Sequence, residues 1–112
     1  ASLRLDWNDI GEQGAADLAA ALAEPSTSLL RSLDLRSNPL GDGGVAAICG
    51  AVAQRAGLSW LGLGETLLTD KGAQDAMPLL RSHPTLAGLD IGENQLTDES
   101  CEAVADVIAH AP

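Results

Sequence analysis

Glu65 and Glu93 are the two residues whose type and spacing come closest to a chemical site. They lie 28 residues apart, at equivalent positions of a repeat described below. Adjacent strands of one sheet would therefore hold their backbones about 5 Å apart. Two carboxylates that close could share a proton or bind a metal ion. Side chains splayed into solvent explain the same spacing, and we favour that interpretation.

No catalytic constellation accompanies this pair. His83 and His110 fall at or beyond the ends of predicted helices, where an imidazolium ion suits the helix dipole. Neither has a cysteine or serine at catalytic spacing. Gly62 and Gly64 suggest a phosphate-binding loop, but they lie within a predicted strand and the lysine of that motif is missing. We therefore expect a protein that is not an enzyme and has neither a cofactor nor a metal site.

The charge of the chain restricts its partners. Sixteen acidic and six basic residues among 112 give a formal net charge of −10. Such a surface repels phosphate backbones and anionic lipids, so we expect no binding to nucleic acid or to membranes. A protein partner with a basic or mixed surface is compatible with it. Alternatively, the charge serves only to keep an Ala- and Leu-rich chain soluble.

The cysteines and the hydropathy indicate the compartment. Cys49 and Cys101 are too far apart in sequence to indicate a disulfide framework. We expect two reduced, buried thiols in an intracellular, cytoplasmic protein. No apolar run reaches the length of a membrane span, and the first residues do not form a signal peptide.

The elements that must position these residues follow from an internal repeat. Four blocks align on Asn8, Asn38, Thr66 and Asn94, at offsets of 30, 28 and 28 residues. Before each anchor, two leucine or isoleucine residues alternate with other residues, which predicts a short strand with one apolar face. These pairs are Leu3 and Leu5, Leu33 and Leu35, Leu61 and Leu63, and Leu89 and Ile91. The longer first offset predicts an extended loop at residues 24–28.

The second half of each repeat predicts a helix. Its apolar residues recur at spacings of three, one and three, as on one face of an α-helix. One such column contains Leu22, Val52, Leu80 and Ile108. A small or hydroxyl residue at the expected cap position is followed by a carboxylate, which suits the positive end of the helix dipole. These pairs are Gly11 and Glu12, Gly41 and Asp42, Thr69 and Asp70, and Thr97 and Asp98. We interpret the acidic residues of the helices, Asp70 included, as solvated convex surface.

The anchor residue predicts how the units are joined. A chain that turns directly after a buried strand leaves backbone groups without ladder partners. The side-chain amide of asparagine donates and accepts at once, so a column of stacked amides can satisfy successive turns. Thr66 interrupts this column with a shorter hydroxyl, and we expect a weaker or water-assisted turn there.

The pattern LxxLxLxxN followed by a helix, with a period of 28 residues, resembles leucine-rich repeats of the ribonuclease-inhibitor type over the whole chain. The resemblance implies an α/β fold, a right-handed solenoid that forms a horseshoe segment. Its parallel sheet would line the concave face and its helices the convex face, and the concave face would bind proteins. We expect one domain over 1–112, with repeats 1–29, 30–57, 58–85 and 86–112, as a fragment of a longer array.

Alternation along the strands then predicts which side chains face a partner. Both tryptophans of the chain fall on the exposed face of the sheet, and tryptophan is enriched in binding hot spots. Trp60 has Gly62 and Gly88 as neighbours, so an alternative is that its ring only shields the sheet. The predicted partner-binding residues are Arg4, Asp6, Trp7, Asp34, Arg36, Trp60, Glu65, Asp90 and Glu93.

The sequence therefore favours a protein–protein interaction module that uses its concave face. Two alternatives remain open. The first is a regulator of the GTPase-activating type, for which Arg4 and Arg36 are the only outward arginines on the strands. The second is a set of purely structural repeats within a larger assembly.

Overall fold

The structure, a computed structural model, describes residues 1–24 and 29–112. Most of the extended loop expected at residues 24–28 lies outside the described residues. The strands are β1 (Ser2–Arg4), β2 (Ser32–Asp34), β3 (Trp60–Gly62) and β4 (Gly88–Asp90). The helices are α1 (Glu12–Leu22), α2 (Gly41–Ala53), α3 (Asp70–Leu80) and α4 (Cys101–Ala109), with the short 3-10 helix η2 (Asp98–Ser100) before α4.

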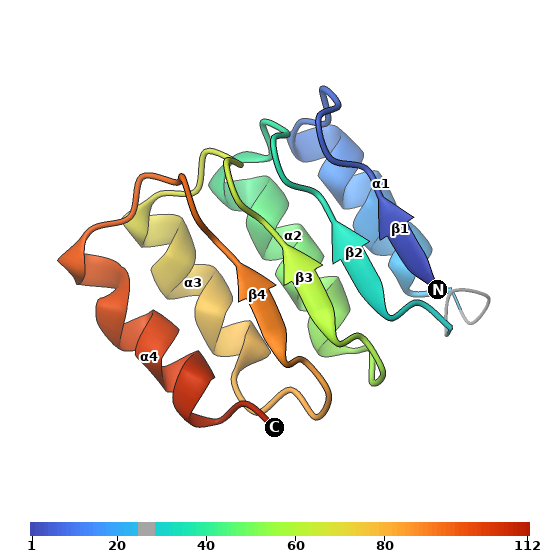
Figure 1. Ribbon diagram of the computed structural model, residues 1–112. Coiled ribbons are helices and arrows are strands. Elements are labelled where there is room, and N and C mark those ends of the chain that lie inside the picture. Colours follow the sequence, from blue (N-terminus) through green and yellow to red (C-terminus); the bar gives the residue numbers. More distant parts are fainter. Residues whose placement is uncertain (25–28) are drawn as a thin grey trace.

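The four strands form one parallel sheet in the order β1-β2-β3-β4. Each strand is followed by a helix, and the helices lie side by side on one face of the sheet (Figure 1). The first leucine of each strand pairs in register with that of the next, so that Leu3, Leu33, Leu61 and Leu89 form one row. This architecture confirms the expected leucine-rich-repeat solenoid.

The core lies between the sheet and the helices and is aliphatic. Leu33, Leu35, Leu61 and Leu63 of the two central repeats are fully buried. They pack against the apolar columns of the helices, which include Val52. No single repeat could cover its own leucines, so the stacking of neighbouring repeats provides the buried surface.

The anchor asparagines link consecutive repeats. The Asn38 side chain donates to the carbonyl of Leu5 (2.8 Å) and accepts from the N–H of Ile10 (3.1 Å), both in the first repeat. Asn94 likewise donates to Leu63 (2.9 Å) and accepts from Leu68 (3.1 Å) in the third repeat. Each amide therefore satisfies the turn of the repeat before its own, as the column of polar residues predicts.

Thr66 breaks this series between the second and third repeats. Its hydroxyl donates to the carbonyl of Leu63 in its own repeat (2.7 Å). The N–H of Leu40, which corresponds to Ile10 and Leu68, donates to the backbone carbonyl of Asn38 instead (2.8 Å). The next residue, Gly41, adopts a left-handed backbone with φ +69°, and α2 begins there with Leu40 in the cap position where Gly41 was expected.

A second series of hydrogen bonds joins the starts of the helices. Asp42 accepts from the N–H (2.8 Å) and the hydroxyl (2.5 Å) of Thr69. Asp70 accepts in the same way from Thr97 (2.8 and 2.5 Å) and also from the hydroxyl of Ser100. The interpretation of Asp70 as merely solvated is therefore wrong, because its carboxylate connects α3 to the following repeat.

A third series covers the ends of the helices. Arg55 donates to the carbonyls of Leu22 and Glu24 near the end of α1. His83, at the equivalent position one repeat later, places Nε2 3.1 Å from the carbonyl oxygen of Val52 and 2.8 Å from that of Arg55. Nδ1 accepts from the N–H groups of Thr85 and Leu86. This pattern assigns the proton to Nε2 of a neutral, buried ring, so the expectation of an imidazolium ion is wrong.

The two thiols differ in exposure. Cys49 is buried in α2, and this burial raises the pKa of its thiol to about 12. Cys101, at the first position of α4, is exposed. The expectation of two buried thiols is correct for Cys49 and wrong for Cys101, because in this repeat the buried position is taken by Ser100 of η2, one residue earlier.

We predict that Asp70 makes the folded chain lose stability in acid. The hydrogen bonds from Ser100 and then Thr97 hold the pKa of Asp70 below its ordinary value. Its contribution is therefore fully present above the unfolded pKa of about 3.9 and is lost as the pH falls through the folded pKa. Urea unfolding at a series of pH values should show the free-energy gap between wild type and Asp70→Asn closing in acid.

The matched control is Asp75→Asn, which removes an exposed carboxylate that forms an ion pair with Lys71 of the same helix. Its unfolding free energy should follow that of wild type more closely at every pH. A gap for Asp70→Asn that is as wide at the lowest pH as at neutral pH would show that the charge of Asp70 is not involved.

Candidate protein-binding face

The residues predicted to bind a partner share the outer face of the sheet and the turns above it. Arg4, Trp7, Glu65 and Glu93 are exposed, and Trp7 is 76% exposed. Intermediate exposure is found for Asp6, Arg36, Trp60 and Asp90. Asp34, also predicted to bind a partner, is only 4% exposed, so little of its carboxylate is open to one.

Arg36 explains the burial of Asp34. Its guanidinium group donates two hydrogen bonds to the Asp34 carboxylate, from Nη2 to Oδ2 (2.8 Å) and from Nε to Oδ1 (2.9 Å). A further contact of 3.4 Å joins Nη1 to Oδ2 of Asp90 on the outer strand β4. The hydrogen bond from the Arg36 side chain lowers the pKa of Asp34, outweighing the opposite effect of burial. The same pairing raises the pKa of Arg36, which keeps a fixed ion pair at the centre of the face.

Trp60 lies flat on the sheet beside this ion pair. A Cβ atom at Gly62 would come within 2.5 Å of ring atom Cη2, and one at Gly88 would collide with Cδ1. The ring therefore needs glycine on both sides. The guanidinium carbon of Arg36 lies 5.4 Å from the ring centroid, within the range of a cation–π interaction. Trp60 thus shields the glycines, as the alternative interpretation proposed, and also supports Arg36.

The turn above each strand presents one further side chain. Trp7, Ser37, Glu65 and Glu93 adopt left-handed backbones with φ of 60°, 61°, 52° and 55°. This conformation costs a residue other than glycine about 1 kcal/mol or more, yet none of the four positions holds glycine. The turns therefore carry a row of four side chains across the C-terminal ends of the strands. Within this row, the Ser37 hydroxyl donates to the Glu65 carboxylate (3.0 Å).

These turns and strands enclose a shallow hollow of about 330 Å³, lined chiefly by Trp7, Arg36, Ser37, Glu65, Asp90 and Glu93. Five of these six were predicted. Ser37 was not, although it occupies the same column of the repeat as Trp7, Glu65 and Glu93. Within residues 1–24 and 29–112, no three His, Cys, Asp or Glu side chains gather as a group able to hold a metal ion.

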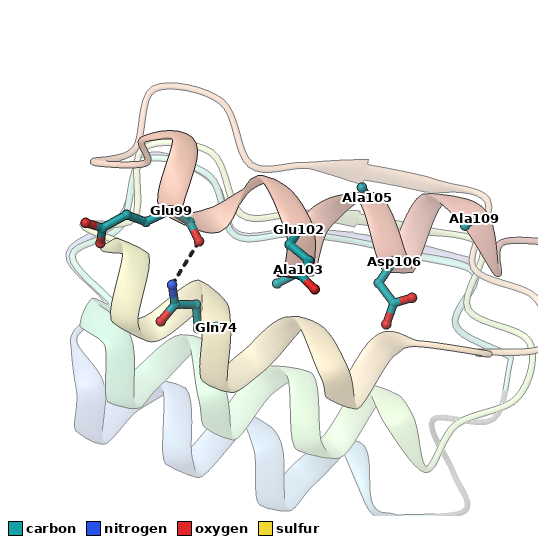
Figure 2. A pocket seen from close by; sticks show the side chains of 7 residues that line it. All are labelled: Gln74, Glu99, Glu102, Ala103, Ala105, Asp106 and Ala109. Atoms are coloured by element: carbon teal, nitrogen blue, oxygen red, sulfur yellow. Dashed lines mark hydrogen bonds between the residues drawn. The ribbon is translucent and has the colours of Figure 1, made fainter.

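A second hollow lies on the helix side and was not predicted. Figure 2 shows it between α3 and α4. Its volume is about 590 Å³. Its lining includes Glu99, Glu102 and Asp106, and the Gln74 side chain donates to the Glu99 carbonyl at one end (2.8 Å). This groove lacks an exposed aromatic residue, so it resembles a binding face less than the sheet does.

None of the helices in the described part of the chain combines the length and the apolar character needed to cross a lipid bilayer.

Comparison with known proteins gives the chain its relatives. A family model described as "Leucine Rich repeat" matches residues 2–19, 28–49 and 82–105. The ribonuclease inhibitor of Sus scrofa is 32% identical over 93% of this chain and 29% of its own length. That of Mus musculus is 34% identical over 94% of this chain and 23% of its own length. The chain thus spans less than a third of the length of these curated relatives.

Two further similarities extend this picture. The Mus musculus protein "NACHT, LRR and PYD domains-containing protein 4E" is 33% identical over 72% of this chain and 8% of its own length. Among solved structures, "Leiomodin-1 Actin-Binding Site 2 (ABS2)" superposes with a TM-score of 0.82, covering 98% of this chain and 64% of that one. Its sequence identity is 16%, so this similarity supports the fold alone.

We predict that the two glycines beneath Trp60 fix the position of its ring. Gly88→Ala, made in a Trp7→Phe background so that Trp60 alone fluoresces, should force the indole off the sheet. Its emission should shift to the red, and acrylamide should quench it more strongly. The matched control is Gly50→Ala in α2, where nothing lies within 4 Å of the new methyl group. That variant should leave the emission unchanged and stabilise the helix by roughly 1 kcal/mol. An unshifted spectrum for Gly88→Ala would refute this placement of the ring.

Proposed function

Because the chain belongs to the leucine-rich repeat family, with repeats of the ribonuclease-inhibitor type, we propose that it binds a protein partner through the concave face of its sheet. The partner has a basic or mixed surface. The observation that carries this proposal is the hollow in which the exposed Trp7 lies along the same edge as Glu65 and Glu93. Trp7 supplies an apolar anchor, and the two carboxylates supply the charge.

Some charged side chains on this face form ion pairs within the chain, and others do not. Arg36 already neutralises Asp34 and contacts Asp90. Among residues 1–24 and 29–112, the Glu65 carboxylate accepts only a neutral hydrogen bond, from Ser37. The negative charge offered to a partner is therefore concentrated on Glu65 and Glu93, in the turns at the C-terminal ends of the strands. A lysine or arginine of the partner would pair with these carboxylates, and it would also gain a cation–π contact over Trp7.

The centre of the face is held rigid before a partner arrives. Arg36 is fixed by two carboxylates and rests over Trp60, which in turn lies flat on two glycines. Side chains that are already ordered lose little conformational entropy on binding. We therefore propose that Arg36 and Trp60 form a rigid, preformed part of the binding face. Trp7, Glu65 and Glu93, in the turns beside it, would make the contacts that depend on the partner.

The proposal favours binding over catalysis. An arginine that stabilises a transferring phosphoryl group must be available to reach it. Arg36 is instead committed to Asp34 and Asp90, so the GTPase-activating alternative would depend on Arg4, whose side chain is exposed and contacts Asp6. Two relatives of this chain carry the name ribonuclease inhibitor, so a basic ribonuclease is the first purified partner to try.

We predict that Trp7→Ala weakens capture of the partner by about tenfold or more, the usual effect of losing an aromatic hot spot. Glu65→Gln with Glu93→Gln should weaken it comparably. The immobilised chain is tested against a basic ribonuclease and, in parallel, against a whole-cell lysate whose captured proteins are quantified by mass spectrometry. The matched control is Glu99→Gln with Glu102→Gln, which removes two exposed charges from the helix side.

The control pair should retain every captured protein at the wild-type level. Equal loss from both charge pairs would indicate attraction by overall charge alone. Full retention by the Trp7 and Glu65/Glu93 variants would place the binding surface elsewhere. Thermal unfolding of each variant, followed by circular dichroism, confirms that a loss of capture is not a loss of fold.

A further inference from the structure

Leu67 combines solvent exposure with a strained backbone. It lies between β3 and α3 and is 55% exposed. Its backbone is left-handed, with φ of 63°, a conformation that glycine adopts freely and asparagine tolerates. The equivalent residues of the other repeats, Asp9, Pro39 and Gln95, all belong to the described chain and none of them has a positive φ. The third repeat therefore places an apolar side chain in solvent at a position that suits leucine poorly.

The exposure of Leu67 does not depend on where the sequence begins or ends. Leu67 belongs to the third of four repeats, and β3 pairs with β2 on one side and with β4 on the other. A further repeat at either end of the array would stack on β1 or β4 and not on this turn. Leu67 is thus open although both of its neighbouring repeats are in place.

The following repeat holds Leu67 in its conformation. The N–H groups of Thr66 (2.8 Å) and Leu68 (3.1 Å) both donate to Oδ1 of Asn94. The backbone on either side of Leu67 is therefore fixed on one oxygen atom, which gives its side chain a fixed direction. These hydrogen bonds do not require leucine, because glycine or asparagine could adopt the same backbone with less strain.

We propose that Leu67 is a specificity-determining contact of the protein-binding face and extends that face onto the turn before α3. The inference rests on the proposed function and adds the chemistry of the partner. Strained residues persist where the surrounding structure fixes them, and they cluster at binding sites. Folding gains little from an exposed, left-handed leucine, whereas a partner that covers it would bury apolar surface.

The neighbours of Leu67 indicate what this partner presents. Glu65, two residues earlier, is exposed and carries one of the two carboxylates that we assign to a basic side chain. Pro39, at the equivalent position of the second repeat, is also exposed, and adjacent strands of a sheet are about 5 Å apart. Leu67 and Pro39 thus place apolar surface beside an acidic side chain. The partner that fits has an apolar side chain next to a lysine or arginine.

A random peptide library displayed on phage tests this chemistry without a known partner. The immobilised wild-type chain should select peptides in which an apolar residue adjoins lysine or arginine. Leu67→Asn should still select the basic residue but lose the apolar preference. Glu65→Gln with Glu93→Gln should lose the basic preference instead. The matched control is Leu79→Asn, which removes a 43% exposed leucine from α3 and should select the same peptides as wild type.

Leu67→Gly and Leu67→Asn also separate binding from stability. Both should bind the peptides selected by wild type about tenfold more weakly, since a leucine side chain is no longer buried in the complex. Both should unfold at the wild-type temperature or above it, because relief of the strain offsets the packing of a half-exposed side chain. Thermal unfolding followed by circular dichroism provides this second readout.

The other outcomes are distinct. Wild-type selection of basic peptides without an apolar preference, or an unchanged preference in Leu67→Asn, would overturn this inference and leave the proposed function standing. Wild-type selection without any basic preference would contradict the proposed function and this inference with it. Unfolding of both Leu67 variants well below the wild-type temperature would show that the side chain serves the fold, which would also overturn the inference.

Discussion

The structure depends on one constraint: the chain turns while its backbone is still buried, and in the first and third repeats groups of that turn are satisfied from outside the repeat. The partner comes from the next repeat, as an asparagine side chain that donates to one backbone carbonyl and accepts from one N–H. Buried backbone groups without partners are costly. The first and third repeats are therefore completed by their successors, and the stacking of repeats serves the polar groups as well as the leucines.

The same dependence sets what the surface can do. Because every repeat contributes one short strand, the outer face of the sheet becomes a series of columns of side chains at fixed spacing. Arg36 can reach Asp34 on its own strand and Asp90 two strands away only because that spacing is fixed. The left-handed turns above the strands then place Trp7, Glu65 and Glu93 along one edge.

The sequence predicted the parts of the structure that repeat. The leucine and asparagine columns gave the strands, the helices and the role of Asn38 and Asn94, because one physical reason acts at every unit. It failed where a side chain interacts outside its column. The burial of Asp34 depends on Arg36, and the neutral ring of His83 depends on carbonyls of the preceding helix. Neither contact follows from periodicity. Cys101 was expected to be a buried, reduced thiol, but it is exposed, whereas Ala15, Val45 and Ala73 at the equivalent positions of the earlier repeats are buried.

The most direct test of this account is to restore a side-chain amide at position 66, where Thr66 interrupts the asparagine column. Asparagine at position 66 would be able to donate to Leu35 C=O and accept from Leu40 N–H, as Asn38 and Asn94 do for their neighbours. The unfolding free energy of Thr66→Asn should equal that of wild type or exceed it by on the order of 1 kcal/mol, the usual net value of a buried hydrogen bond. The amide hydrogen of Leu40 should also exchange more slowly. Clear destabilisation, with exchange at Leu40 unchanged or faster, would contradict the claim that the amide column holds the repeats together.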